Sequence, residues 1–186
     1  MNPLLAYFKF WWHSKNEHGV HSPFVFDLVT KCFYDRTKHK AYQQRSRTDS
    51  KSKFLIRLSA YFKFESCFIP ESISENFEYA LNIENKTSKF NSITELLKTE
   101  SLISKAPCLI YVDPHSIGSH AIADLLNVCH HDSLILIDSI RKNKTQFKRW
   151  NQFKSDPQVS VSIDTFYWGL IFLRTAQPKE HFTIRL

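Results

Sequence analysis

Two aspartates, Asp113 and Asp138, each follow directly on a short apolar run, CLIYV and SLILI. Unbroken apolar runs of this length are typical of buried parallel strands, and the carboxyl ends of such strands line the crevice in which open α/β sheets bind ligands. Two carboxylates there could hold Mg²⁺ or another hard divalent cation, and His115 beside Asp113 could serve as an acid or base. The alternative is that both aspartates cap the helices that follow the strands.

A second candidate site is the stretch FESCFIPESISENF, residues 64–77, which reads as a short strand, a proline turn and a helix capped by Ser72 with Glu75. Nucleotide-binding folds place a glycine-rich loop at such a turn, and this stretch contains no glycine. The whole chain of 186 residues has three glycines, each isolated, so it holds neither a G-x-G-x-x-G motif nor a P-loop.

The elements that would position these residues alternate from Lys53 onward. Helices are predicted over 54–62, 72–81, 92–103, 118–129 and 144–154, and strands over 66–69, 108–113, 133–138, 159–164 and 169–174, with an extended piece over 182–186. This order predicts an α/β fold of the doubly wound, Rossmann-like kind: a mostly parallel sheet with a C-terminal antiparallel hairpin. At the hairpin tip, Phe166, Tyr167 and Trp168 are expected to be exposed and to cover a substrate pocket or form a homodimer contact; packing back onto the domain is the alternative.

The segment before Lys53 reads as a helical extension with a basic loop. Apolar residues recur at helical spacing in its first part, namely Leu4, Leu5, Phe8, Trp11 and Trp12. This side is expected to dock on the domain, with a membrane surface or a partner protein as the alternatives. Ser22 and Pro23 form a helix start, and 35–52 is polar and aperiodic. We therefore divide the chain into an extension, 1–52, and an α/β domain, 53–186.

The formal charge of +7 is concentrated in two segments. Residues 35–53 hold seven Lys or Arg against two Asp, and residues 141–154 hold six and no acid. These patches could meet an acidic partner or, as the less favoured case, a nucleic acid; solvated surface is the alternative. Four widely spaced cysteines without a C-x-x-C pair favour reduced core thiols and a cytoplasmic location. The N-terminal apolar run is too short for a membrane span and lacks the marks of a signal peptide.

Longer motifs carry a family resemblance. The segments HGVHSPFVFDLVTKCFYD near the start, and DPQVSVSIDTFYWGLIFLR with KEHFTIRL near the end, resemble a bacterial group of class I S-adenosylmethionine-dependent methyltransferases related to O-methyltransferases. Within that resemblance, IYVDPH is similar to the family's fourth strand ending and LILIDSI to its fifth. Asp113, His115 and Asp138 then take the positions of catalytic or metal-binding residues, and Ser139 replaces the second of two paired acids.

The resemblance also implies where S-adenosylmethionine would bind. The family's glycine-bearing turn after the first strand corresponds here to Ile69, Pro70, Glu71 and Ser72, and the acid that holds the cofactor ribose corresponds to Glu84. Proline removes a backbone donor, and each other non-glycine residue adds a Cβ. Glu71 adds negative charge where the methionine carboxylate would lie, at a helix start that would otherwise attract it.

Three functions follow as hypotheses. The first is a methyltransferase-like protein that has lost S-adenosylmethionine binding and acts through a partner or another small ligand. The second is an active S-adenosylmethionine-dependent O-methyltransferase with a divergent loop, in which Asp113 and Asp138 position Mg²⁺ or substrate. The third is a basic adaptor that binds RNA or an acidic protein through residues 35–53 and 141–154, with an affinity that falls steeply as salt rises.

Overall fold

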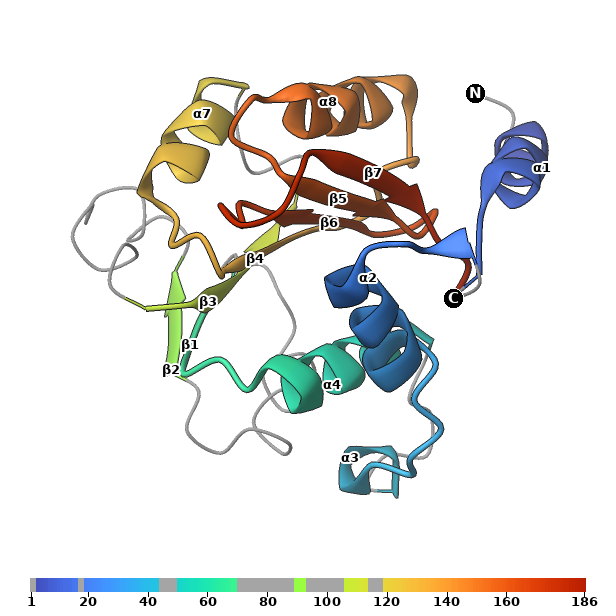
Figure 1. The fold of residues 1–186 in the computed structure, drawn as a ribbon, viewed down its shortest axis with the longest axis vertical. Coiled ribbons are helices and arrows are strands. Elements are labelled where there is room, and N and C mark those ends of the chain that lie inside the picture. Colours follow the sequence, from blue (N-terminus) through green and yellow to red (C-terminus); the bar gives the residue numbers. More distant parts are fainter. Residues whose placement is uncertain (1–2, 17–18, 44–49, 70–88, 93–105, 114–118) are drawn as a thin grey trace.

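A computed structural model describes residues 3–16, 19–43, 50–69, 89–92, 106–113 and 119–186 (Figure 1). Within these ranges seven strands form one sheet in the order β2-β1-β3-β4-β6-β5-β7. The strands are β1 Ser66–Ile69, β2 Lys89–Ser92, β3 Cys108–Val112, β4 Leu134–Ile137, β5 Val161–Asp164, β6 Gly169–Phe172 and β7 Glu180–Thr183.

The sheet is mixed, and most of its strand pairs are parallel. β1, β2, β3 and β4 pair in parallel, as β5 and β7 do. β6 runs antiparallel to both of its neighbours, β4 and β5. The predicted hairpin is therefore confirmed, with Asp164 opposite Gly169 at its closed end. The expected mixed α/β sheet is confirmed at this level of detail.

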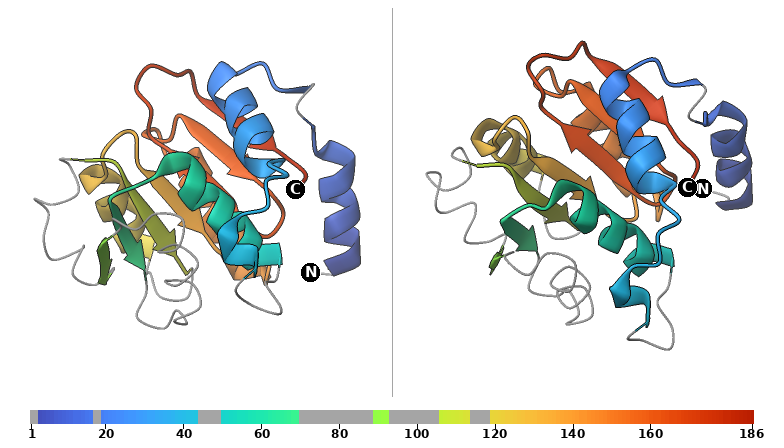
Figure 2. Two further views of the ribbon diagram at one scale, coloured as in Figure 1. Left: turned by 90° about the horizontal axis from the view of Figure 1, so that it is seen from below. Right: turned by 60° about the horizontal axis from the view of Figure 1, so that its bottom comes forward.

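Helices cover both faces of the sheet (Figures 1 and 2). α2 Pro23–Leu28, continued by a π-helical turn over Val29–Phe33, packs on one face with α4 Ser50–Phe62. α7 Ser119–Val128 and α8 Lys144–Ser155 pack on the other. The remaining helices are α1 Pro3–His13 and the single turn α3 Lys40–Gln43. Among the described residues, no helix has both the length and the apolar character needed to cross a bilayer.

The core divides along the alternation of the strands. In β3, Leu109 and Tyr111 face α2 and α4, whereas Ile110 and Val112 face α7 and α8. Every residue of β3 is buried, as a strand covered on both faces requires. Because helices cover both faces of the sheet, side chains on both faces of β3 must be apolar, and the first charged residue comes only after the strand, at Asp113.

Local signals at helix starts are confirmed where the chain is described. The Ser22 hydroxyl accepts a hydrogen bond from the Val25 amide at 3.4 Å, with Pro23 in the first helical turn. Asn143 caps α8 in the same way, by accepting from the Gln146 amide at 2.9 Å. Such caps satisfy amides that have no partner within the helix.

Three expectations about elements need correction. The proposed boundary between residues 52 and 53 falls inside α4, and part of the stretch expected to be irregular is helical in α3 and α4. β2 occupies residues that the sequence leaves without a strand. The helices expected over 72–81 and 92–103 lie outside the described residues, except for Ser92. Three of the four β2 residues are polar, and an edge strand of the sheet needs no continuous apolar run, because backbone pairing holds it to β1.

The hairpin tip is mostly buried, contrary to the expectation that all three aromatics are exposed. Phe166 and Trp168 are 8% and 3% exposed, whereas Tyr167 is 56% exposed. Phe166 makes edge-on ring contacts with Tyr7 and Phe10 of α1 at centroid distances of 5.0 and 5.3 Å. The tip therefore packs back onto the domain, and only Tyr167 is left in solvent.

The side of α1 expected to dock is largely exposed. Leu4 is 80%, Phe8 60% and Trp12 71% exposed, whereas Phe10 is buried. The helix docks instead through the side that carries Tyr7 and Phe10, because these rings meet Phe166 of the hairpin. In Figures 1 and 2, α1 lies at the outer side of the molecule, beside the C-terminal segment.

The four cysteines are all free thiols, as predicted. Cys32, Cys67 and Cys108 are buried, and Cys129 is partly buried. Burial raises the pKa of the Cys32 thiol to about 12. Cys32 therefore stays protonated, and the buried cysteines behave as small apolar core residues.

Candidate functional site

The carboxyl ends of β3 and β4 bring the two predicted aspartates to neighbouring positions. Val112 pairs with Ile137 in parallel register, so Asp113 and Asp138 are the next residues on adjacent strands. The Asp138 amide donates to the Val112 carbonyl at 3.0 Å and continues the pairing beyond the strands. Both side chains are partly buried. The sequence prediction that they share one edge of the sheet is confirmed, and their chemical role stays a prediction.

The carboxylate of Asp138 is already hydrogen-bonded. Tyr111 donates its hydroxyl to Asp138 Oδ2 at 2.9 Å, and Ser139 donates to Oδ1 at 2.9 Å. Burial, followed by the nearby Asp138 charge, raises the pKa of Tyr111 well above its usual value. Tyr111 therefore remains a protonated donor and is unsuited to act as a base. A metal ion at Asp138 would have to share its oxygens with two hydroxyl donors.

This edge of the sheet also holds a nearly buried pair of charged residues, Arg141 and Asp164, which the sequence analysis did not single out as a site. Arg141, just after β4, pairs with Asp164 at the end of β5 through two bonds of 2.5 Å, one from each terminal nitrogen to each carboxylate oxygen. Their side chains are 12% and 11% exposed. The arginine lies 4.9 to 5.3 Å from the ring centres of Phe10, Phe147 and Phe166. We call Arg141 and Asp164 the buried ion pair.

The buried ion pair also holds the hairpin tip. Asp164 Oδ1 accepts from the Phe166 amide at 2.9 Å, and Arg141 donates to the Phe166 carbonyl at 3.3 Å. Phe166 has a φ of 74°, in the left-handed region that a bulky residue rarely adopts. Charge-assisted bonds on both sides of this residue stabilise the strained turn.

Two cavities lie at this edge of the described structure. The first, which we call the edge groove, has a volume of about 540 Å³ and includes Ser139, the residue after Asp138, in its lining. Its walls come from α1, from the segment after β4 and from the hairpin tip, namely Leu4, Tyr7, Ser139, Arg141, Lys142, Phe166 and Tyr167. The second lies on the other side of the hairpin tip, against α4, with a volume of about 430 Å³. Both volumes fall in the range of small-molecule sites.

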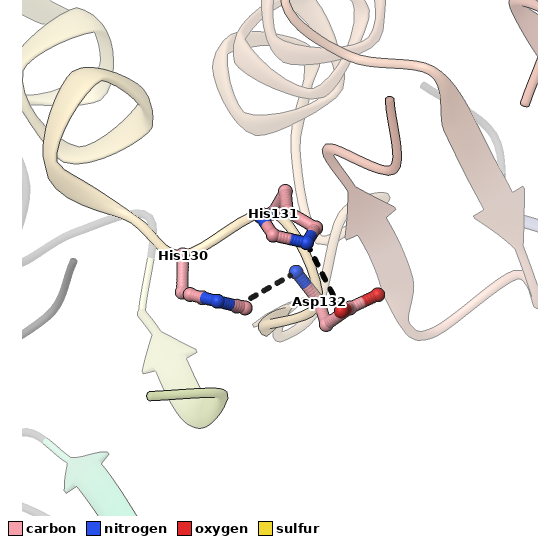
Figure 3. A group of neighbouring side chains, drawn as sticks. All are labelled: His130, His131 and Asp132. Carbon is pink, nitrogen blue, oxygen red and sulfur yellow. Dashed lines mark hydrogen bonds and ion pairs between the residues drawn. The ribbon is translucent and has the colours of Figure 1, made fainter. Parts of the chain in front are cut away.

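A separate cluster of His130, His131 and Asp132 follows α7 (Figure 3). Their ligand atoms lie within 4.8 Å of one another, the one such group of three among the described residues. Asp132 is already paired, however, with Arg174 at 3.0 Å and with His131 at 3.2 Å, and its amide donates to His130 Nδ1 at 3.1 Å. The contacts are those of a hydrogen-bonded turn whose carboxylate is neutralised by an arginine.

The predicted cofactor residues are placed only in part. Ile69 is buried at the end of β1. Glu71, Ser72, Glu84 and the predicted acid/base His115 lie outside the described residues. In sequence Glu84 precedes β2, whose bounds are Lys89–Ser92, so Glu84 does not stand at the carboxyl end of that strand.

Of the two residues of the buried ion pair, which the sequence analysis did not identify as a site, only Asp164 has a recognisable sequence pattern. Asp164, like Asp113 and Asp138, directly follows a predicted strand, VSVSI, although this strand alternates Val or Ile with Ser and is not an unbroken apolar run. Its partner Arg141 belongs to a segment interpreted as a basic patch, and nothing local in the sequence separates one inward arginine from its exposed neighbours. A search against models of known protein families and a search of curated proteins both find no match for this chain.

Proposed function

We propose that this chain is a methyltransferase-fold protein that has lost the ordinary S-adenosylmethionine site and acts by binding another small ligand or a protein partner. The observation that carries the proposal is the end of β1 at Ile69, followed directly by Pro70 and Glu71. The nearest glycines in the sequence are Gly19 and Gly118. The turn that should cradle the cofactor therefore has no residue free of a Cβ.

The sheet supports the same proposal. Parallel strands closed by the antiparallel β5–β6 hairpin agree with the fold that the resemblance to class I methyltransferases implies. In this proposal the chain keeps the methyltransferase scaffold, while the chemistry of the turn is replaced. Proline offers no amide to the methionine carboxylate, and Glu71 and Glu75 repel it.

Isothermal titration with S-adenosylmethionine and S-adenosylhomocysteine, with and without Mg²⁺, tests this function. We expect no heat and no shift in Tm up to millimolar ligand, in protein that unfolds cooperatively. A micromolar Kd, about −8 kcal/mol of binding free energy, would overturn the proposal. The variant Glu71→Gln/Glu75→Gln distinguishes two causes of lost binding. If S-adenosylmethionine binds this variant but not the original protein, the negative charge is the cause, and not the absence of glycine.

A second function, an active O-methyltransferase, is favoured by the neighbouring positions of Asp113 and Asp138 at the carboxyl ends of β3 and β4. In that case the aspartates would hold Mg²⁺, which lowers the pKa of a substrate hydroxyl. Transfer of labelled methyl groups to a hydroxyl substrate that is lost in Asp113→Asn and in Asp138→Asn would support it. Full activity in both variants would exclude these roles.

The third function, a basic adaptor, is favoured by Lys142, Lys144 and Lys148, which are exposed and have no acid among residues 141–154. Arg141 does not contribute to this surface, because Asp164 neutralises it. Binding to an RNA or to an acidic peptide should weaken steeply as salt rises, and a flat salt response would exclude this function.

A further inference from the structure

The second cavity at the sheet edge combines aromatic walls with positive charge. We call it the basic aromatic cavity. It is formed by α1, the start of α4, the hairpin tip and the segment after β7, and its lining residues are Tyr7, Phe10, Trp11, Lys53, Phe54, Arg57, Thr165, Phe166, Tyr167, Trp168, Arg185 and Leu186. Seven of these twelve are aromatic, whereas none is acidic.

The three cations of the cavity, Lys53, Arg57 and Arg185, have no carboxylate partner among the described residues. Each lies near an aromatic ring instead. Arg185 is 5.3 Å from the centre of the Trp11 ring, and Arg57 is 6.0 Å from that of Phe54. Ring contacts of this kind hold a cation in place without cancelling its charge.

Arg57 contributes its guanidinium to the wall of the cavity and forms no ion pair within the described part of the chain. Its Nε is buried and has no hydrogen-bond partner among the described residues. Because that nitrogen is buried, a ligand in the cavity would pair with the rest of the guanidinium. A guanidinium next to open space is suited to an oxygen anion, which it binds through two parallel bonds.

The neighbouring edge groove provides an internal contrast. It also contains an arginine, Arg141, but Asp164 occupies both of that residue's terminal nitrogens. The net charge left for a ligand is therefore greater in the basic aromatic cavity. Two cavities that share Tyr7, Phe166 and Tyr167 thus differ in whether their arginine has a carboxylate partner.

We propose that the basic aromatic cavity binds a small organic anion that joins a planar aromatic ring to a phosphate or carboxylate. The anionic oxygens would pair with Arg57, Lys53 and Arg185. The ring would stack on Tyr7, Trp11 or Tyr167, the aromatic side chains of the lining that are 47% to 56% exposed. A volume of about 430 Å³ accommodates such a ligand. This inference stands apart from the proposed function, because it concerns α1 and α4 and not the turn after β1.

Three probes separate the two halves of the recognition: 1-naphthyl phosphate, 1-naphthol, which has the ring without the charge, and inorganic phosphate, which has the charge without the ring. Titrations would be run in about 0.15 M salt to screen long-range attraction. We expect naphthyl phosphate to bind at least tenfold more tightly than either of the others. If 1-naphthol binds as tightly as 1-naphthyl phosphate, the charge plays no part and the site is only an apolar cavity. If inorganic phosphate binds as tightly, the ring plays no part and the site is only a cluster of cations. Either result overturns the proposal.

Variants locate the binding. Arg57→Gln and, independently, Arg185→Gln should each weaken naphthyl phosphate at least tenfold, so the second serves if the first does not fold. Lys148→Gln removes an exposed charge of α8 outside the cavity and should leave Kd unchanged. Trp12→Ala removes an exposed ring of α1 and should also leave Kd unchanged. Equal losses in the arginine variants and in these controls would show nonspecific adsorption and would overturn the proposal.

Discussion

Removing the negative charge of Asp164 should destabilise the protein far more than removing a surface charge. Asn at this position keeps the size of the side chain and the oxygen that accepts from the Phe166 amide. It leaves Arg141, which is 12% exposed and surrounded by three aromatic rings, without its carboxylate. The perturbation therefore isolates the charge of the pair.

The magnitude follows from the burial of both partners. Breaking a buried ion pair by removing one partner costs about 3–5 kcal/mol, and the slight exposure here favours the lower end, about 3 kcal/mol. For a chain of this length each kcal/mol lowers Tm by about 2–4 °C, so Asp164→Asn should lower Tm by about 6–12 °C. The double variant Arg141→Met/Asp164→Asn should regain most of that loss, because no uncompensated charge remains.

Urea unfolding followed by tryptophan fluorescence measures these differences. The matched control is Asp27→Asn, which removes an ion pair between Asp27 and Lys31. The side chain of Asp27 is 47% exposed and that of Lys31 is 63% exposed. That pair should contribute less than about 0.5 kcal/mol. If Asp164→Asn costs no more than Asp27→Asn, water reaches Arg141 and the assignment of a buried ion pair is wrong.

Further predictions concern packing, pH and thiol reactivity. Gly169→Ala should cost about 2–3 kcal/mol, since its Cβ would lie 2.5 Å from a ring carbon of the buried Trp150; Gly19→Ala meets only a flexible lysine side chain and should cost less, as urea unfolding will show. Partial burial lowers the pKa of His181 below 6.5, so the unfolded chain takes up the proton first as pH falls. Stability should therefore decrease as pH falls below about 7, and a pH series on His181→Gln should be flatter. Cys32, with its raised pKa, should react with a thiol reagent only at the rate of unfolding, and faster labelling in the folded protein would contradict its burial.

Local signals in the sequence predicted those elements whose causes are local. The Ser22–Pro23 helix start depends on neighbouring residues, and the runs before Asp113 and Asp138 must be apolar because the sheet is covered on both faces. β2 escaped prediction because a strand at the edge of the sheet is held by backbone bonds to β1, which place little demand on its side chains.

The charged part of the edge could not be predicted because it depends on strand order. Asp164 and Arg141 are 23 residues apart in sequence, and they meet because the β5–β6 hairpin lies beside β4. The burial of Phe166 depends in turn on where α1 docks. Charge runs and aromatic clusters in sequence therefore gave the right segments but not the direction in which each side chain points.

The contact between the first and last parts of the chain has a consequence for folding during synthesis. Lys15 pairs with Ile184, and the Tyr34 hydroxyl donates to the Arg185 carbonyl at 2.9 Å across 151 residues. α1 and α2 leave the ribosome long before the residues that they contact after β7, so these contacts cannot form until that segment has been synthesised. Contacts this distant in sequence also slow folding, because the chain loses the entropy of closing a long loop before the contacts can stabilise it.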